Sequence, residues 1–185
     1  MISPFRVGVA AHAVRRGGVV AYPTEAVWGL GCDPANAEAV VRLLALKGRD
    51  PAQGFIVLAA TEDHLAGLLA PLPSDAEARM RASWPGPVTW VVPAAPHVPE
   101  WLTGGRDTLA VRITAHPVAA ALCRAAGGPL VSTSANRSGA RPARSATEVR
   151  LQFGRRIDAL LPGPRGELDR PTPIREAVSG RYLRR

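Results

Sequence analysis

The sequence predicts a single α/β domain in which an open, twisted, mixed β-sheet is flanked by helices. Short apolar runs that are typical of strands alternate along the chain with segments whose apolar residues recur at helical spacing. The length of 185 residues, with 46% apolar and 21% charged residues, fits one globular domain. We therefore expect one domain over residues 1–185, in which residues 170–185 form a flexible tail that closes over the site.

In the first half of the chain, each expected element has a local signal. Ser3 and Pro4 open a helix and Gly17 ends it, the apolar spacing of Val40 to Leu46 marks another helix, and Gly48 breaks it. The expected order is a helix at 4–16, a strand at 19–22, a loop at 23–34, a helix at 36–48, a strand at 55–60, a helix capped by Thr61 and a helix opened by the capping box Ser74-x-x-Glu77.

In the second half, alternation and capping boxes continue the same pattern. Leu109, Val111 and Ile113 alternate with Ala110 and Arg112, as in a half-buried strand. The expected order is strands at 88–93 and 109–113, a helix at 117–126, a strand at 129–132, a helix opened by Ser145-x-x-Glu148 and a last strand at 174–178.

The composition limits the class of protein. The two cysteines exclude a disulfide scaffold and lack the neighbours of a structural zinc site. No apolar run approaches the roughly 18 residues of a membrane span, and the first residues do not resemble a signal peptide. We therefore expect a cytoplasmic protein that does not bind a membrane and whose side chains do not coordinate a metal ion.

The positive charge is concentrated in the second half of the chain. The net charge is +8; residues 1–100 carry eight basic and nine acidic residues, whereas residues 101–185 carry 15 and six. Six arginines lie between Arg137 and Arg156, with Glu148 as the only acid among them. This asymmetry indicates an anionic partner, which is a nucleotide, RNA or an acidic protein, or else an ordinary solvated basic surface.

Lys47 is the only lysine among the 23 basic residues. Because lysine is a compact point charge and arginine is a planar fork, a lone lysine in an arginine-rich chain suggests a place where arginine does not fit. Close contact with a phosphate or carboxylate oxygen is one such place. Arg49 follows two residues later, and the break at Gly48 would let both cations converge.

Two polar loops follow predicted strands and are further candidates for a binding site. The first contains Thr24 and Glu25 followed by two glycines, and the second is the hydroxyl-rich run from Ser132 to Gly139. Polar groups at the carboxyl ends of strands bind ligands in open α/β sheets, and small hydroxyls with their N–H groups can hold an anion. Arg112, in an otherwise apolar strand, is costly unless it is paired and is also a ligand candidate.

Taken together, these segments resemble the YrdC-type family of threonylcarbamoyl-AMP synthases, in its short bacterial form. The matching segments occur in family order and cover nearly the whole chain. They are Tyr22-Pro-Thr-Glu25 with Gly29-Leu-Gly31, Lys47-x-Arg49, Trp84-Pro-Gly-Pro-Val-Thr89, Leu109-Ala-Val-Arg112 with His116-Pro117, Ser132-Thr-Ser-Ala-Asn136 with Ser138-Gly139, and Pro171-Thr-Pro-Ile-Arg175. The sequence departs from the family pattern at Ala26, Trp28, Asp50 and Pro173, and Leu58 stands where longer relatives carry a histidine.

The resemblance implies a YrdC-like fold with a basic concave cleft, and a reaction. L-threonine, bicarbonate or CO2, and ATP with Mg²⁺ would give threonylcarbamoyl-AMP and pyrophosphate, with no tightly bound cofactor, and a separate transferase complex would pass the product to tRNA. It implies that Lys47 and Arg49 are catalytic and that ATP is bound by Lys47, Arg49, Thr108, Ser132, Asn136 and Arg184. It implies that threonine is bound by Thr24, Arg112, Ser134 and Thr172.

Two other functions remain open from the residues alone. The basic half of the chain would suit a module that binds double-stranded RNA or tRNA without chemistry, although aromatic residues for base stacking amount to only 5%. The second function is a related carbamoyl transfer in hydrogenase maturation. The enzyme of that reaction normally carries zinc fingers and an acylphosphatase domain, and neither has a counterpart in this sequence.

Overall fold

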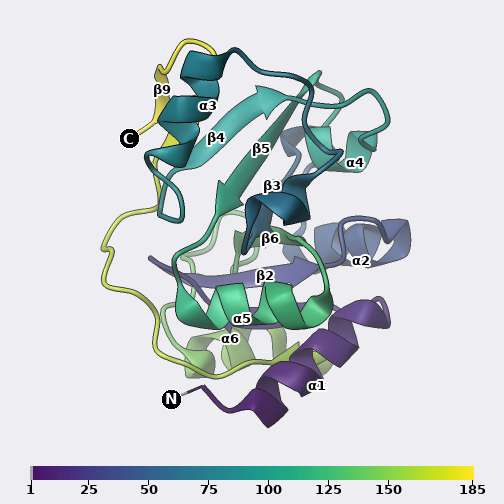
Figure 1. The fold of residues 1–185 in the computed structure, drawn as a ribbon. Coiled ribbons are helices and arrows are strands. Elements are labelled where there is room, and N and C mark those ends of the chain that lie inside the picture. Colours follow the sequence, from purple (N-terminus) through teal and green to yellow (C-terminus); the bar gives the residue numbers. More distant parts are fainter. Residues whose placement is uncertain (1) are drawn as a thin grey trace.

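The computed structural model describes residues 2–185, which form one nine-stranded mixed sheet with helices on both faces (Figure 1). The strand order is β7-β1-β2-β6-β3-β5-β4-β8-β9. The strands are β1 (Val20–Pro23), β2 (Trp28–Cys32), β3 (Ile56–Ala59), β4 (Thr89–Pro93), β5 (Thr108–Ile113), β6 (Leu130–Ser134), β7 (Ala159–Leu160), β8 (Ile174–Glu176) and β9 (Tyr182–Arg184). The α-helices are α1 (Pro4–Arg15), α2 (Ala37–Lys47), α3 (Ser74–Arg81), α4 (Glu100–Thr103), α5 (Pro117–Ala126) and α6 (Ala146–Phe153), and the 3-10 helices are η1 (Pro51–Gln53), η2 (Glu62–Leu65) and η3 (Gly154–Arg156). The predicted α/β class and mixed sheet are confirmed.

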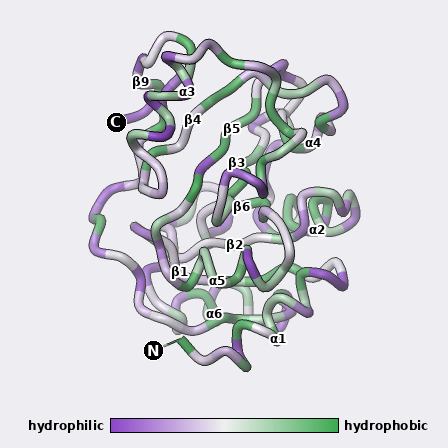
Figure 2. Tube along the Cα trace, in the orientation of Figure 1, coloured by the Kyte–Doolittle hydropathy of each residue, from purple (hydrophilic) through white to green (hydrophobic). Residues whose placement is uncertain are grey.

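The two faces of the sheet bury different apolar clusters. Side chains alternate along each strand, so Val20 and Tyr22 of β1 point to one face while Ala21 points to the other. Helices α1 and α5 lie side by side on the first face, and α5 is hydrophobic along most of its length (Figure 2). Val40 and Leu43 of α2 join the cluster on the second face, as do Val149 and Phe153 of α6. Because α1 and α5 cover only part of the first face, the remainder stays open.

The segment expected to be a loop at 23–34 contains a central strand instead. β2 pairs with β1 through the short turn at 24–27 and with β6 on its other side. The expectation was wrong because glycine has low strand propensity, and β2 contains two of them. Tertiary contacts require Gly31: a Cβ there would lie 2.4 Å from the Val131 carbonyl oxygen and 3.0 Å from Tyr22.

Helix ends follow the predicted signals at α2 and α6 but not at α3. The Asn36 side chain accepts from the Ala39 N–H, Gly48 ends α2 in the left-handed region at φ 59°, and Ser145 accepts from the Glu148 N–H. In α3 the residue expected to be the cap, Ser74, is already helical, with Pro73 at the N-cap position and no side-chain cap. In place of the α-helix expected after Thr61, the structure has a single turn of 3-10 helix, η2.

The C-terminal residues extend the sheet. β8 pairs with β4 in parallel and β9 pairs with β8, so residues 174–184 form a hairpin at the edge of the sheet. Arg175 places its guanidinium 4.7 Å from the ring centroids of both Trp90 and Tyr182, which holds the hairpin on β4.

Candidate active site

A cavity of about 700 Å³ lies over the part of the first sheet face that α1 and α5 leave uncovered. Its lining includes eight of the ten site residues that the sequence suggested. They are Thr24, Arg49, Thr108, Arg112, Ser132, Ser134, Thr172 and Arg184. Lys47 and Asn136 are not among the lining residues and lie in the loop region beside the cavity.

Strand alternation explains why distant segments meet here. Ser132 and Ser134 are two residues apart in β6, and Thr108, Ala110 and Arg112 are alternate residues of β5, so each set faces one side of the sheet. β3 lies between these strands, where Ile56 pairs with both Ser132 and Ala110. The sheet therefore forms the floor of the cavity.

Tyr22 fixes the position of Ser132 on this floor. Its ring lies across the two glycines of β2, and its hydroxyl donates to the Ser132 Oγ at 3.0 Å. Complete burial raises the pKa of Tyr22 well above its usual value, so the phenol keeps its proton. Ser132 accepts this bond, and its own hydroxyl hydrogen stays available to a ligand.

Lys47 binds the backbone of the hydroxyl-rich loop that follows β6. Its Nζ donates to the Ser134 carbonyl at 2.5 Å and to the Asn136 carbonyl at 2.8 Å, and the Lys47 carbonyl accepts from the Ser138 N–H. The side chain is only 3% exposed, and burial together with the charge of Arg49 lowers the pKa of Lys47 to about 8. The ammonium thus lies in the 134–136 loop and not in open solvent.

Asn136 organises the same loop from within. Its Nδ2 donates to the carbonyls of Arg137 and Ala140, both at 2.9 Å, and its Oδ1 accepts from the Ser134 hydroxyl at 2.6 Å. Lys47 and Asn136 together hold Ser134 at the cavity wall.

Arg49 lines the cavity itself. Its Nη2 donates to the Gly54 carbonyl at 2.9 Å, and its guanidinium lies 5.2 Å from the centroid of the Phe55 ring. Burial and the neighbouring charge of Arg106 lower the pKa of Arg49, but an arginine keeps its proton at neutral pH. An anion between Arg49 and Arg106 would relieve their repulsion.

Arg112 is paired rather than free. Its Nη1 donates to the Thr172 hydroxyl at 2.6 Å, and its Nη2 lies 3.3 Å from the Glu25 carboxylate. Thr172 also binds Arg184, whose Nη2 donates to the Thr172 carbonyl at 2.8 Å. Burial and the charge of Arg112 lower the pKa of Arg184. These bonds link the C-terminal hairpin to β5.

Thr24 lies at the turn between β1 and β2. Its hydroxyl donates to the Val27 carbonyl at 2.7 Å, so its oxygen is still free to accept a hydrogen bond, and Thr24 lines the cavity. The Thr24 carbonyl in turn accepts from the Gly166 N–H at 2.9 Å.

The lining favours an anionic ligand. Four arginines line the cavity (Arg49, Arg106, Arg112 and Arg184), and no Asp or Glu side chain is among the lining residues. Within residues 2–185, no three His, Cys, Asp or Glu side chains are grouped so as to hold a metal ion. Over the same residues, no helix is long and apolar enough to span a membrane.

Sequence reasoning missed several residues around the cavity. Arg106 and Thr103 reach it through α4 and the following turn, and no motif marked them. Glu25 stood in a recognised motif, but its buried contacts to Arg112 and Thr114 could not be read from the sequence. His116 occupies the N-cap position of α5 without a side-chain capping bond, and it is buried.

A cavity on an α/β sheet that is lined by hydroxyls and four arginines, with no acidic side chain in the lining, is typical of proteins that bind an anionic small molecule. The family model for Sua5, YciO and YrdC, described as telomere recombination, matches residues 12–185. The chain therefore belongs to the Sua5/YciO/YrdC family.

Relatives of high identity carry one name. The chain is 68% identical to the threonylcarbamoyl-AMP synthase of Halorhodospira halophila over 98% of its own length and 95% of that protein, and 49% identical to that of Coxiella burnetii over 95% and 94%. The structure of P. abyssi Sua5 complexed with L-threonine superposes with a TM-score of 0.90 at 34% identity, covering 95% of this chain but 52% of Sua5. E. coli YciO, at 24% identity and a TM-score of 0.85, shows the fold alone.

Proposed function

We propose that this chain is an L-threonylcarbamoyladenylate synthase, a nucleotidyltransferase of tRNA modification. The observation that carries the proposal is the 68% identity, over nearly the full length of both chains, to a protein named threonylcarbamoyl-AMP synthase. The amine of L-threonine forms a C–N bond with CO2 and loses a proton, or with bicarbonate and releases water, to give N-carboxy-threonine. The carboxylate of this carbamate attacks the α-phosphorus of ATP. A new P–O bond forms, the bond to the β-phosphate breaks, and pyrophosphate leaves.

The cavity suits this chemistry because adenylyl transfer needs positioning and charge neutralisation more than covalent catalysis. The carbamate is already an anion, so its attack needs no general base. Arg49, Arg184 and the hydroxyls of Thr108 and Ser132 would bind ATP, and Mg²⁺ would enter with its phosphates. No cofactor beyond these substrates is required.

Threonine would bind at the part of the cavity where β5, the 24–27 turn and the C-terminal hairpin meet. Arg112 offers its guanidinium to the amino-acid carboxylate, and Thr24, Ser134 and Thr172 offer hydroxyls. P. abyssi Sua5 was solved in complex with L-threonine, which supports this choice of substrate.

Lys47 would act at the same centre through the 134–136 loop. Two of its N–H groups are taken by carbonyls, and the next acceptor, Asn136 Oδ1, lies 3.5 Å from Nζ. We assign this third N–H to a phosphate oxygen of bound ATP, beside Arg49 and Asn136. The charge of Lys47 would then stabilise the departing pyrophosphate.

The C-terminal segment would complete the site. Pro171, Thr172, Leu183 and Arg184 line the cavity, so residues 170–185, held at the edge of the sheet, would cover the ligands and shield the mixed anhydride product from water. The product would pass to a threonylcarbamoyl transferase complex in the cytoplasm, where tRNA is modified.

Direct contact with tRNA or double-stranded RNA is a second proposal. All six arginines between Arg137 and Arg156 are exposed. They would bind the phosphate backbone without reading sequence. This contact would accompany catalysis and not replace it, because the cavity and the full-length relatives favour the enzyme.

The decisive experiment measures pyrophosphate release from ATP with L-threonine and bicarbonate present, and with each omitted. We expect release to need both, and Lys47→Ala to abolish it. Pyrophosphate release that does not depend on threonine would contradict the proposed function. A fully active Lys47→Ala variant would contradict the role of Lys47.

A further inference from the structure

The Arg112–Glu25 pair is the most deeply buried ion pair among residues 2–185. The two side chains are 6% and 10% exposed, whereas each other pair has at least one side chain that is 42% exposed or more. Arg112 lines the cavity but Glu25 does not. Glu25 therefore contacts a cavity-lining side chain without lining the cavity itself.

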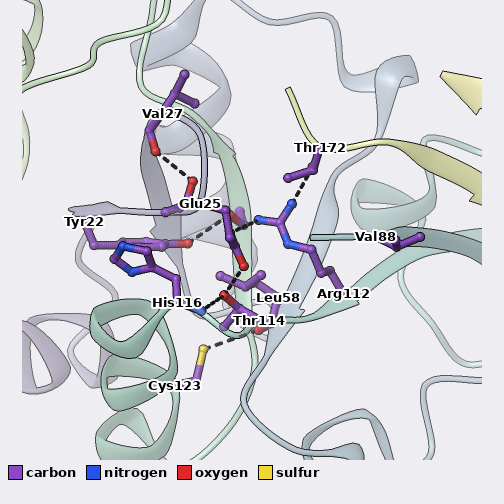
Figure 3. A network of polar contacts seen from close by, with 12 residues as sticks. Tyr22, Glu25, Val27, Leu58, Val88, Arg112, Thr114, His116, Cys123 and Thr172 are labelled. Carbon is purple, nitrogen blue, oxygen red and sulfur yellow. Dashed lines mark hydrogen bonds and ion pairs between the residues drawn. The ribbon is translucent and has the colours of Figure 1, made fainter. Parts of the chain in front are cut away.

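Glu25 is itself held from the side that faces away from Arg112. Its Oε1 accepts from the Thr114 hydroxyl at 2.5 Å, and the Thr114 Oγ1 accepts from the His116 N–H at 3.0 Å (Figure 3). Since Thr114 follows β5 and His116 precedes α5, the carboxylate is anchored to two rigid elements.

The same network reaches the segment that leads to the C-terminal hairpin. His116 Nε2 lies 3.1 Å from the Pro164 carbonyl, which can only accept, so Nε2 carries the hydrogen. The Glu25 carbonyl accepts from the Leu168 N–H at 3.1 Å, and Arg112 binds Thr172. Residues 164–172 are thus attached to Glu25 and its partners at both ends.

The present partners of Arg112 do not satisfy all of its N–H groups. Its Nε is buried without a hydrogen-bond partner, and so are the Thr89 Oγ1 and the Glu25 Oε2, so the 3.3 Å contact between Arg112 and Glu25 is an ion pair without hydrogen-bond geometry. In the β4–β5 ladder, Trp90 pairs with Val111, so Thr89 is the residue opposite Arg112. A guanidinium released from Glu25 could turn to satisfy Nε and would then present different N–H groups to the cavity.

We propose that Glu25 is a positioning residue that holds the Arg112 guanidinium in the orientation that receives the carboxylate of the amino-acid substrate. This inference rests on the proposed function. Glu25 touches no substrate, and it fixes which edge of the planar guanidinium faces the cavity.

The test is calorimetric titration of L-threonine and, separately, of ATP into the wild type, Glu25→Gln and the exposed control Glu38→Gln. Glutamine keeps the size of the side chain and an acceptor for Thr114 but removes the charge. We expect Glu25→Gln to weaken threonine binding about tenfold and to leave ATP binding within about twofold, with the control unchanged. In an Arg112→Ala background, Glu25→Gln should have no further effect on threonine binding.

Each other outcome has a distinct meaning. If the wild type binds ATP but not threonine, the proposed function fails. If Glu25→Gln binds threonine as well as the wild type or more tightly, the neighbouring negative charge only weakens Arg112 and the positioning role is wrong. An equal loss of threonine and ATP binding would show a general structural role, and it would also overturn the inference.

Discussion

Lys47 shows how one residue can be both structural and chemical. Its ammonium joins the end of α2 to the loop after β6, in a space bounded by two carbonyls. An arginine fork is longer and planar and would not fit between them, which gives a physical reason for a single lysine in a chain with 23 basic residues.

The pKa of Lys47 leads to a prediction about ATP binding. Because burial and Arg49 lower this pKa to about 8, the ammonium loses its charge as the pH rises through that value. ATP affinity, measured by calorimetry between about pH 7 and 9.5, should fall across that range. Lys47→Arg, which stays charged, should bind ATP weakly at every pH because it disturbs the loop. A flat wild-type profile would contradict the proposed phosphate contact.

His116 leads to a prediction about stability. Burial lowers its pKa below the ordinary value of about 6.5, so the folded protein favours the neutral ring. A group whose folded pKa is lowered contributes stability above its unfolded pKa and loses it as the pH falls through the folded one. The free energy of unfolding in urea should therefore decrease below about pH 6.5. In His116→Gln that part of the decrease should be absent; an unchanged pH dependence would contradict this assignment.

At the scale of elements, β2 depends on the absence of side chains at its glycines. Gly31→Ala places a methyl group against the Val131 carbonyl and Tyr22, so we expect a loss of about 1–3 kcal/mol in the free energy of unfolding. Urea denaturation measures it. Gly128→Ala is the matched control, since nothing lies within 4 Å of the place that its methyl group would take. Equal stability of the two variants would show that β2 can shift.

The C-terminal hairpin supplies Arg184 to the cavity, and this can be tested without unfolding the strand. Arg184→Ala removes a guanidinium that binds the Thr172 carbonyl, so we expect KM for ATP to rise about tenfold or more while Tm changes little. Arg181→Ala, an exposed change in the same hairpin, is the control. Equal KM values for ATP in both variants would contradict the assignment of Arg184 to the ATP site.

At the scale of the whole molecule, the charge asymmetry predicts salt-dependent RNA binding. Filter binding of a double-stranded RNA should weaken steeply with salt, and replacing Arg150 and Arg155 with alanine should reduce the slope of log affinity against log salt by about two. Pyrophosphate release should not change in this variant. An unaltered slope would show that RNA does not contact α6 and the turn after it.

Much of the architecture follows from local signals. The α/β class, most strand positions and the ends of α2 and α6 were predicted. This was possible because hydrophobic periodicity and helix capping depend on residues that are close together in the sequence. The strand β2 and the short helix α4 were not, since β2 contains glycines and α4 is a single turn.

The sequence by itself determined the alternation of strands and helices, the motifs that identify the family and eight of the residues that line the cavity. Only the tertiary structure decided that Lys47 and Asn136 lie beside the cavity, that Glu25 pairs with Arg112, and that the C-terminal hairpin joins the sheet. The physical reason is that periodicity and capping arise within a few residues of the chain. The partner of a buried charge is instead chosen by strand pairing between segments that are far apart in the sequence.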